Sequence, residues 1–402
     1  ARQVLALCQS AVIKPPGQKD YWAWVTLGEA CLLLGDDREA LAAYEQAINF
    51  VEGKFAWIVS SLQQLRLLAN QGLPVPQPLF DLLKPPTVVV FTGHMLDHPK
   101  RGSPRFPPEL EHTVRKEIEM HLEALDARIG YSSAACGADL LFNEAMQERE
   151  AEVNIVLPFA MEDFIETSVA HAGRKWIARF RRAMQVAHSV KYVTEERFLG
   201  DELLFRFAGQ IFHGYADLRA RALDTVPHLL AVWDGDPTIR VGGTADIVNR
   251  WPDPDRLHVI RLPATDAAAT LAEEGSAPPQ YHRLIRTMLF ADVVGYSALP
   301  ENYLPVYIHD FLVRVSHELA QLPHRPLFVN TWGDALFAVM DEATGLIEYA
   351  FALHNAVARA NAALPELPNP LEVRIALHAG PVYADVDPFT GKENFYGAHV
   401  NR

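Results

Sequence analysis

The chain has 402 residues, of which 49% are hydrophobic, and its formal net charge at pH 7 is −14. This length exceeds that of one compact core, so we expect two or three globular domains. The negative charge argues against nonspecific nucleic-acid binding as the main task. The sequence has no apolar run of about 18 or more residues, so it predicts no membrane span. The three cysteines, Cys8, Cys31 and Cys136, lack metal-ligand spacing, which is typical of a reducing compartment. We therefore expect a soluble cytoplasmic protein.

The first predicted elements are two helices within residues 21–50, separated by the turn "GDD". Their small and aromatic residues resemble a tetratricopeptide repeat at Trp24, Leu27, Gly28, Cys31, Ala40, Tyr44 and Ala47. A plain helical hairpin is the alternative. Helical patterns at 1–13 and 55–70 predict neighbouring repeats. The resemblance implies that residues 1–75 bind a protein partner, and because such repeats stack in numbers we expect more of them before residue 1.

A Pro-rich connector at residues 71–86 is followed by apolar runs, such as "TVVVFTG" and "HLLAVWD", that alternate with helical patterns. This alternation predicts, for residues 86–263, a Rossmann-like parallel sheet covered by helices on both faces. Ligands of such sheets bind at the carboxyl ends of the strands. The candidate ligand-binding residues at those ends are Gly93, Ser132, Ser133, Gly137, Asp234, Gly242, Gly243 and Thr244.

The segment "GYSSAACGADLLFNEAMQE" leads a glycine and small hydroxyls into a helix, which suits an anion at the helix N-terminus. It matches neither the Walker A loop nor the G-x-G-x-x-G fingerprint. Together with "AVWDGDPTIRVGGTADIV" it resembles the nucleotide-binding SLOG group, which includes the DNA-processing protein A fold and the LOG phosphoribohydrolases. The stretch "VGGTADIV" lacks the proline and glutamate of the hydrolase loop "PGGxGTxxE". The resemblance therefore implies sensing of a nucleotide-like ligand, with a purely structural domain or a hydrolase as alternatives.

An Ala-, Glu- and Pro-rich linker is predicted at residues 264–282, and the pattern then becomes β-α-β-β-α-β, a ferredoxin-like order. In "MLFADVVGYSAL" the first strand ends with Asp292, and in "NTWGDALFAV" the hairpin of the next two strands carries Asp334. Because the first strand lies beside that hairpin in such a sheet, we expect the two aspartates to face each other. A turn-capping role for Asp292 is the alternative.

Two carboxylates at one point repel each other unless a cation lies between them. Magnesium fits such a pair, because it takes one or two carboxylates and completes its shell with water and substrate phosphates. Backbone N–H groups of the following turn and one arginine can hold the phosphates. These candidate phosphate-binding residues are Val293, Val294, Gly295, Tyr296, Ser297 and Arg374.

Four segments, "FADVVGYSAL", "NTWGDALFAV", "VRIALHAGPVYA" and "NFYGAHVN", resemble the class III adenylate/guanylate cyclase catalytic domain over residues 283–402. The resemblance implies that Asp292 and Asp334 hold two Mg²⁺ or Mn²⁺ ions. These ions help the ribose 3′-hydroxyl to attack the α-phosphate, with release of pyrophosphate. It also implies that Asn401 orients the ribose, and that the protein is a homodimer, since family active sites form between two catalytic domains.

The sequence departs from the family at the base-reading positions, where adenylate cyclases have lysine and aspartate and this chain has Asn330 and Asn394. An amide both donates and accepts, so ATP is the default substrate and GTP or a pyrimidine triphosphate stays open. The family's transition-state arginine falls at position 405, so we expect this chain by itself to be inactive.

The predicted fold class is thus a multidomain α and α/β protein with a helical repeat, a Rossmann-like parallel sheet and a ferredoxin-like cyclase domain. We expect a cytoplasmic, bacterial nucleotide cyclase that is regulated by the other two domains. The alternative is a signalling or defence sensor that binds nucleotide and has lost turnover.

Overall fold

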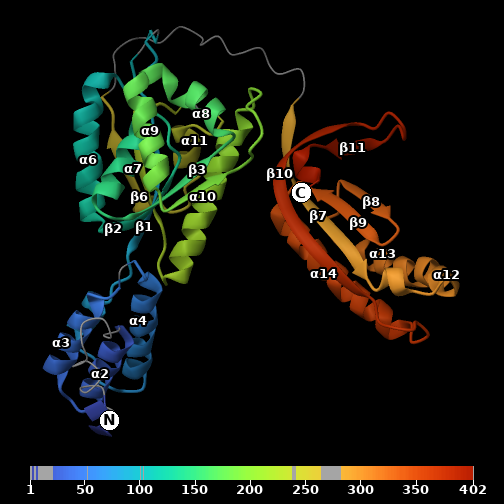
Figure 1. The fold of residues 1–402 in the computed structure, drawn as a ribbon, viewed down its shortest axis with the longest axis horizontal. Coiled ribbons are helices and arrows are strands. Elements are labelled where there is room, and N and C mark those ends of the chain that lie inside the picture. Colours follow the sequence, from blue (N-terminus) through green and yellow to red (C-terminus); the bar gives the residue numbers. More distant parts are fainter. Residues whose placement is uncertain are drawn as a thin grey trace. The chain divides into compact units, whose positions relative to one another are not determined.

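The computed structural model describes residues 2, 3, 6, 7, 21–51, 53–99, 101, 102, 104–237, 241–263 and 282–401. The protein is a mixed α/β chain that contains a six-stranded parallel sheet (Figure 1). It divides into two compact units, Ala1–Glu195 with Ala208–Leu271 and Glu196–Phe207 with Ala272–Arg402. Most of the helix expected at 1–13 and all but the last residue of the expected linker lie outside the described residues.

The N-terminal helices are α2 (Tyr21–Leu33), α3 (Asp37–Ile48), α4 (Phe55–Asn70) and α5 (Gln77–Leu82). The Asp36 side chain caps α3 by accepting a hydrogen bond from the N–H of Glu39 at 3.1 Å. Gly28 allows α2 and α3 to approach closely, because a Cβ atom there would lie 2.6 Å from the Tyr44 ring. The two helices expected at residues 21–50 are therefore present, and their assignment to the tetratricopeptide family stays a prediction.

The parallel sheet consists of β1 (Thr87–Gly93), β2 (Ala127–Ser132), β3 (Glu152–Leu157), β4 (Ser189–Tyr192), β5 (His228–Trp233) and β6 (Leu257–Arg261). The strand order is β4-β3-β2-β1-β5-β6, and all neighbouring pairs are parallel. The order reverses between β1 and β5, so the carboxyl ends of these two strands flank the point at which α/β sheets bind ligands. The central strands read as unbroken apolar runs because both faces are covered.

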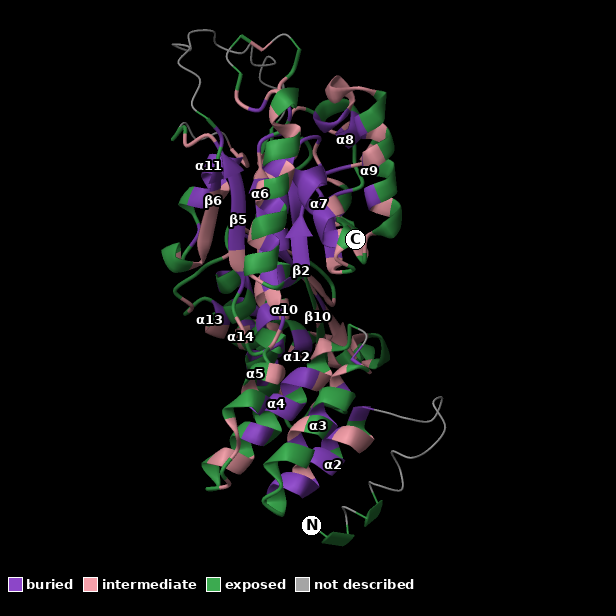
Figure 2. Cartoon of the chain, turned by 90° about the vertical axis from the view of Figure 1, so that its left-hand side faces the viewer, coloured by how far each residue is buried: buried purple, intermediate pink, exposed green. Residues whose placement is uncertain are grey.

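The helices and turns of this part are η2 (Pro108–Leu110), α6 (Glu111–Ala124), α7 (Ala138–Glu148), α8 (Met161–Ser168), η3 (Ala170–Ala172), α9 (Arg174–Val186), α10 (Leu203–Ala222), α11 (Thr244–Asn249) and η4 (Pro254–Arg256). Figure 2 shows β2 and β5 as buried, whereas much of α6 is exposed. Helix α6 buries only Val114, Ile118 and Leu122, whose spacing forms a single apolar stripe.

The second sheet consists of β7 (Arg283–Val294), β8 (Phe328–Trp332), β9 (Ala335–Met340), β10 (Glu372–Val386) and β11 (Glu393–Tyr396). Its order is β11-β10-β7-β9-β8, and every neighbouring pair is antiparallel. The helices and short turns of this sheet are η5 (Tyr296–Ala298), η6 (Glu301–Tyr303), α12 (Leu304–Val306), the π-helical η7 (Tyr307–Leu312), α13 (Val313–Leu319), α14 (Ala343–Ala363) and η8 (Ala398–Val400).

The core of the second sheet lies on one face, where Leu289 and Ala338 pack against Phe311 of η7 and Leu353 of α14. The opposite face carries a smaller apolar cluster of Met288, Phe337, Val339, Val382 and Phe395. This opposite face also carries the single 3-10 turn η8 but no described α-helix of the second unit, and we call it the helix-free face. Across the described part of the chain, no helix combines the length and apolar character that crossing a membrane requires.

Candidate active site

Antiparallel pairing in the second sheet aligns three candidate residues. Asp292 at the end of β7 pairs with Ala335 of β9 on one side and with Arg374 of β10 on the other. The N–H of Val293 donates to the carbonyl oxygen of Asp334 at 3.0 Å, so the hairpin that carries Asp334 is fastened to the end of β7. The two aspartates, 42 positions apart in the sequence, are therefore held on neighbouring parts of one sheet.

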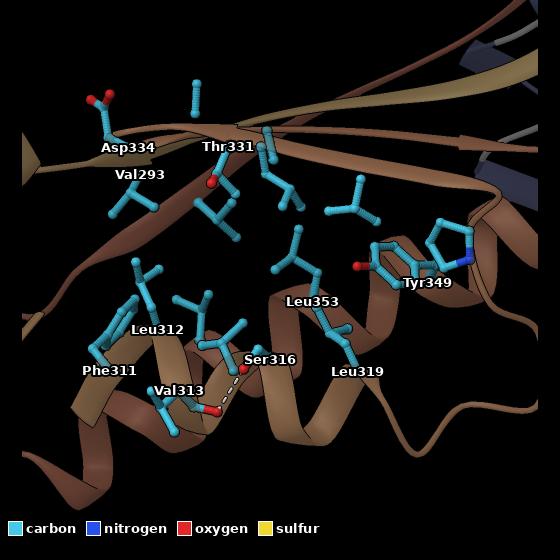
Figure 3. Close-up of a pocket in the computed structure, with 18 of the residues that line it drawn as sticks. Val293, Phe311, Leu312, Val313, Ser316, Leu319, Thr331, Asp334, Tyr349 and Leu353 are labelled. Carbon is cyan, nitrogen blue, oxygen red and sulfur yellow. Dashed lines mark hydrogen bonds between the residues drawn. The ribbon is translucent and has the colours of Figure 1, made fainter. Parts of the chain in front are cut away.

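Both carboxylates lie on the helix-free face. Ala291 and Val293, which flank Asp292, belong to the helix-side core, so the alternation of strand side chains turns Asp292 to the other face. Figure 3 shows Val293 pointing toward the helices and the carboxylate of Asp334 pointing away from them, on the far side of the sheet. A group bound by both carboxylates would therefore lie on this face of the sheet.

Arg374 and Asp292 form an ion pair across β10 and β7, in which Nη2 donates to Oδ2. The side chains are 76% and 40% exposed, respectively. Exposed pairs of this kind contribute only about 0–1 kcal/mol, so a cation or a phosphate can compete for either partner. The sequence predicted Arg374 as a phosphate ligand, and the structure also gives it the role of counter-ion to Asp292.

A buried phenol, which the sequence analysis did not single out, lies beneath the hairpin. The Tyr307 hydroxyl donates to the carbonyl oxygen of Gly333 at 3.4 Å. Burial raises the pKa of Tyr307 above its ordinary value, and the negative potentials of Tyr296, Asp334 and Asp292 raise it further. Both aspartates thus act electrostatically on one protonated hydroxyl. No motif in the sequence indicated this residue, because its role depends on how η7 packs under the hairpin.

The two aspartates are of the ligand type that a hard divalent cation prefers. Within the described ranges, no three His, Cys, Asp or Glu side chains group closely enough to hold a metal ion by themselves. Two half-buried carboxylates on one face match the way Mg²⁺ binds, with one or two protein ligands and the rest from water and phosphate. The ion pair with Arg374 shows how the charge of Asp292 is balanced by the protein alone.

The turn after β7 needs a glycine for its backbone conformation. Gly295 has a φ of 93°, in the left-handed region that favours glycine, and it precedes the single turn η5. The first N–H groups of such a turn, those of Tyr296 and Ser297, have no acceptor within the turn. The N–H of Val293 is already bonded to Asp334, so it is less available to a phosphate than the sequence suggested.

The candidate base-reading residues do not converge within one chain. Asn330 lies on β8 and Asn394 on β11, the two opposite edges of the five-stranded sheet. The Asn330 side chain accepts from the N–H of Thr331 at 3.0 Å. The Asn394 side chain accepts from the N–H of Phe395 at 2.8 Å and donates to Asp387 at 3.3 Å. Each amide is thus bonded locally.

Asn401 is also distant from the aspartates. It follows η8, whose His399 packs on Gly380, since a Cβ atom on Gly380 would lie 2.3 Å from the ring nitrogen Nδ1. Gly380 lies six residues beyond Arg374 on β10, or roughly 20 Å along an extended strand. One chain therefore does not bring Asn401 to the aspartate pair.

At the parallel sheet, His94 and Asp234 connect the ends of β1 and β5. His94 Nε2 lies 3.1 Å from Oδ1 of Asp234 and 3.3 Å from its backbone nitrogen. Burial lowers the pKa of His94, and the carboxylate of Asp234 offsets only part of this effect. The pair occupies the point at which the strand order reverses, where a polar ligand would meet both side chains.

Most other ligand candidates at this sheet already have structural tasks. A Cβ atom on Gly93 would lie 2.4 Å from Cβ of Ala138, and one on Gly137, which has a φ of 97°, would lie 2.6 Å from the backbone nitrogen of Leu96. The buried Ser132 hydroxyl donates to Asn143 at 2.7 Å. These contacts explain the residue types through close packing and internal hydrogen bonding.

The remaining candidates lie in two short segments at the same end of the sheet. The carbonyl oxygen of Ser133 accepts from Ser132 at 2.8 Å and from Asn143 at 2.9 Å. The N–H of Gly242 donates to the buried Asp246 at 2.9 Å. Gly243 and Thr244 begin α11. A ligand role for these residues stays a prediction.

A buried carboxylate that the sequence analysis missed stands at the start of α7. Asp139 is buried and accepts from the N–H of Ala135 at 3.2 Å. Burial raises the pKa of Asp139 to about 7, against the opposing effect of hydrogen bonds from the N–H groups of Ala135 and Gly93. Its position in "CGAD" is ordinary for a helix first turn, so the sequence offered no signal of its burial.

No protein-family model matches the sequence, and no curated protein matches it. Among solved structures, similarity is found to the guanylyl cyclase Cya2, with 17% identity, 30% of this chain and 68% of that chain covered, and a TM-score of 0.27. A bacterial light-regulated adenylyl cyclase has 15% identity, with 30% of this chain and 67% of that chain covered, and a TM-score of 0.26. The guanylate cyclase domain of RhGC from Catenaria anguillulae in complex with GTP has 18% identity, with 29% and 68% covered and a TM-score of 0.24. Scores this low support no inference about activity or substrate.

Proposed function

We propose that residues 283–402 form a class III nucleotide cyclase domain with a ferredoxin-like fold. The reaction converts a nucleoside triphosphate, ATP by default, into a 3′,5′-cyclic nucleotide and pyrophosphate. The single observation that supports this proposal is the placement of Asp292, near the end of β7, and Asp334, in the β8–β9 hairpin, on adjacent segments and on the same face of one sheet. A turn-capping role for Asp292 would not require a second carboxylate on the same face.

In this proposal Asp292 and Asp334 hold two Mg²⁺ or Mn²⁺ ions. When bound, the ions help to deprotonate the ribose 3′-hydroxyl and neutralise charge at the α-phosphate. Arg374 exchanges its contact with Asp292 for one with the triphosphate, because guanidinium groups match phosphate geometry well. The turn of Gly295, Tyr296 and Ser297 supplies backbone N–H groups to the phosphates, and Val293 keeps the hairpin in place.

We propose that the complete site forms between two copies of the chain. Asn401 lies roughly 20 Å along the sheet from the aspartate pair, and Asn330 and Asn394 lie on opposite edges of the sheet. These separations support a homodimer in which one copy contributes the aspartates and the other contributes Asn401, which orients the ribose.

The other domains are proposed to regulate this activity. Residues 86–263 act as a SLOG-type domain that binds a nucleotide-like ligand. The reversal of strand order beside His94 and Asp234 supports this assignment. Residues 1–75 act as tetratricopeptide-like repeats that hold a protein partner, and residues 264–282 act as the linker to the cyclase domain. We place the protein in the bacterial cytoplasm.

The test measures pyrophosphate release by the protein in a form that extends past position 405, with ATP, GTP, CTP or UTP and with Mg²⁺ or Mn²⁺. At least one nucleotide should give product. Asp292→Asn and Asp334→Asn should each lower the rate about 100-fold or more, since each removes a ligand of the ions. Asp310→Asn, which removes an exposed carboxylate of η7, is the matched control and should leave the rate unchanged.

A second candidate function is a nucleotide-binding sensor without turnover. The observation that favours it is the local bonding of Asn330 and Asn394, which engages both amides away from a base. A sensor would bind a nucleoside triphosphate in equilibrium dialysis and release no pyrophosphate at protein concentrations that sustain dimers. That result would refute the enzyme and support the sensor.

A further inference from the structure

A cavity of about 550 Å³ lies between the second sheet and its helices, and its lining includes Asp334, whose carboxylate points away from those helices (Figure 3). Buried apolar side chains of η7, α13 and α14, among them Phe311, Leu319 and Leu353, form its interior. Its rim includes Val313 and Val329, which are 40% and 47% exposed although both line the cavity. The volume lies within the range of small-molecule sites, and the exposed rim gives a ligand a way in.

The polar side chains that line this largely apolar space include Ser316, Thr331, Asp334 and Tyr349. Tyr349 of α14 is only 4% exposed, and Figure 3 shows its hydroxyl pointing into the cavity. In the described part of the chain the hydroxyl has no hydrogen-bond partner. Burial raises the pKa of Tyr349, so the group stays protonated and can donate. An acceptor atom of a ligand in the cavity could therefore accept a hydrogen bond from this hydroxyl.

A guanidinium group without an ion-pair partner among the described residues lies at the same end of the cavity. Arg325 lines the cavity, and its Nη2 donates to the carbonyl oxygen of Ala320 at 3.0 Å. No described carboxylate forms an ion pair with it. His324, the residue before Arg325, packs against α14 at Gly345, where a Cβ atom would lie 3.4 Å from Cβ of His324. Gly345 lies one helical turn before Tyr349 on the same helix. The loop that carries Arg325 and the Tyr349 hydroxyl therefore share one end of the cavity.

We propose that this cavity binds a small amphipathic carboxylate of the fatty-acid type. The carboxylate pairs with the guanidinium of Arg325 and accepts a hydrogen bond from the Tyr349 hydroxyl. The alkyl chain extends between Leu319, Leu353 and Phe311, where it replaces water next to apolar surface. The binding itself does not depend on the proposed cyclase activity.

The far end of the cavity connects this site to the candidate active site. Its wall includes Gly333 and Ala335, which flank Asp334, and Ala291 and Val293, which flank Asp292. An alkyl chain that fills the cavity would thus contact both segments that carry the aspartates. A change of turnover on binding rests on the proposed function, whereas occupancy of the cavity does not.

The test titrates decanoate and 1-decanol into the full 402-residue chain by isothermal calorimetry, below the concentration at which decanoate forms micelles. We expect saturable binding of decanoate with one site per chain. Arg325→Gln should weaken the binding of decanoate at least about fivefold and leave the binding of 1-decanol unchanged, since only the acid carries a charge. Tyr349→Phe should weaken decanoate about fivefold, the effect of one hydrogen bond. Val329→Trp should abolish binding by filling the rim.

Arg314→Gln is the matched control, because it removes the same charge from an exposed position of α13 outside the cavity lining. It should bind decanoate like the unchanged chain. Absence of saturable decanoate binding overturns the proposal, and so does binding that Val329→Trp, Arg325→Gln and Tyr349→Phe all leave unchanged. Equal binding of 1-decanol and decanoate would overturn the assignment of Arg325 as the partner of the carboxylate. If the 402-residue chain binds decanoate but the form extended past position 405 releases no pyrophosphate, the cyclase proposal fails and the cavity proposal stands.

Discussion

Replacement of the buried carboxylate in Asp139→Asn should change how the stability of the first unit depends on pH. In the folded chain burial raises the pKa of Asp139 to about 7, from an ordinary value of 3.8. Between these values the folded state holds a proton that the unfolded state has lost. The free energy of unfolding therefore falls as pH rises through this window, and the contribution is fully present only below the ordinary value.

The size of the effect follows from the two pKa values. At about 1.36 kcal/mol per pKa unit, the contribution of Asp139 to the free energy of unfolding falls by about 2–3 kcal/mol between about pH 5 and about pH 8. The amide of Asp139→Asn is uncharged throughout, so the variant should lack this loss. It keeps one oxygen that can accept from the N–H of Ala135. The variant should thus gain stability relative to the unchanged chain as pH rises.

Thermal unfolding followed by circular dichroism, at about pH 5 and about pH 8, measures this difference. Glu123→Gln, an exposed carboxylate on α6, is the control and should follow the pH profile of the unchanged chain. Parallel profiles for Asp139→Asn and the unchanged chain would refute the reasoning, because they would mean that the folded and unfolded states bind the proton of Asp139 equally well.

Two further predictions concern the candidate active site. Arg374→Gln removes the counter-ion of Asp292, so Mn²⁺ alone should bind up to about threefold more tightly in a paramagnetic-resonance titration. A nucleoside triphosphate should bind more weakly, because it loses a phosphate partner. Tighter binding of both the ion and the nucleotide would contradict the double role of Arg374. Tyr307→Phe removes the hydroxyl that donates to Gly333. Because this hydrogen bond is long, its loss should destabilise the hairpin by no more than about 1 kcal/mol and increase hydrogen exchange at β9. Unchanged exchange would show that the bond does not hold the hairpin.

The sequence by itself was informative where the signal is local. Unbroken apolar runs such as "VVVF" in β1 predicted strands covered on both faces, and the turn "GDD" separated two helices, because side-chain periodicity and turn residues act over a few neighbours. The Gly-Asp turn placed Asp334 in a hairpin, and the order of the elements was enough to predict that the hairpin would lie beside the strand that carries Asp292 near its end.

Only the tertiary structure decided which side chains meet. Strand register paired Arg374 with Asp292, packing of η7 placed Tyr307 under the hairpin, and the approach of α7 to the loop after β1 required Gly93 and Gly137. The cavity beside Tyr349 arises because helices from two separate parts of the chain do not fill the space over the sheet. These contacts depend on residues far apart in the sequence, and their geometry is set by register and packing, which no local pattern encodes.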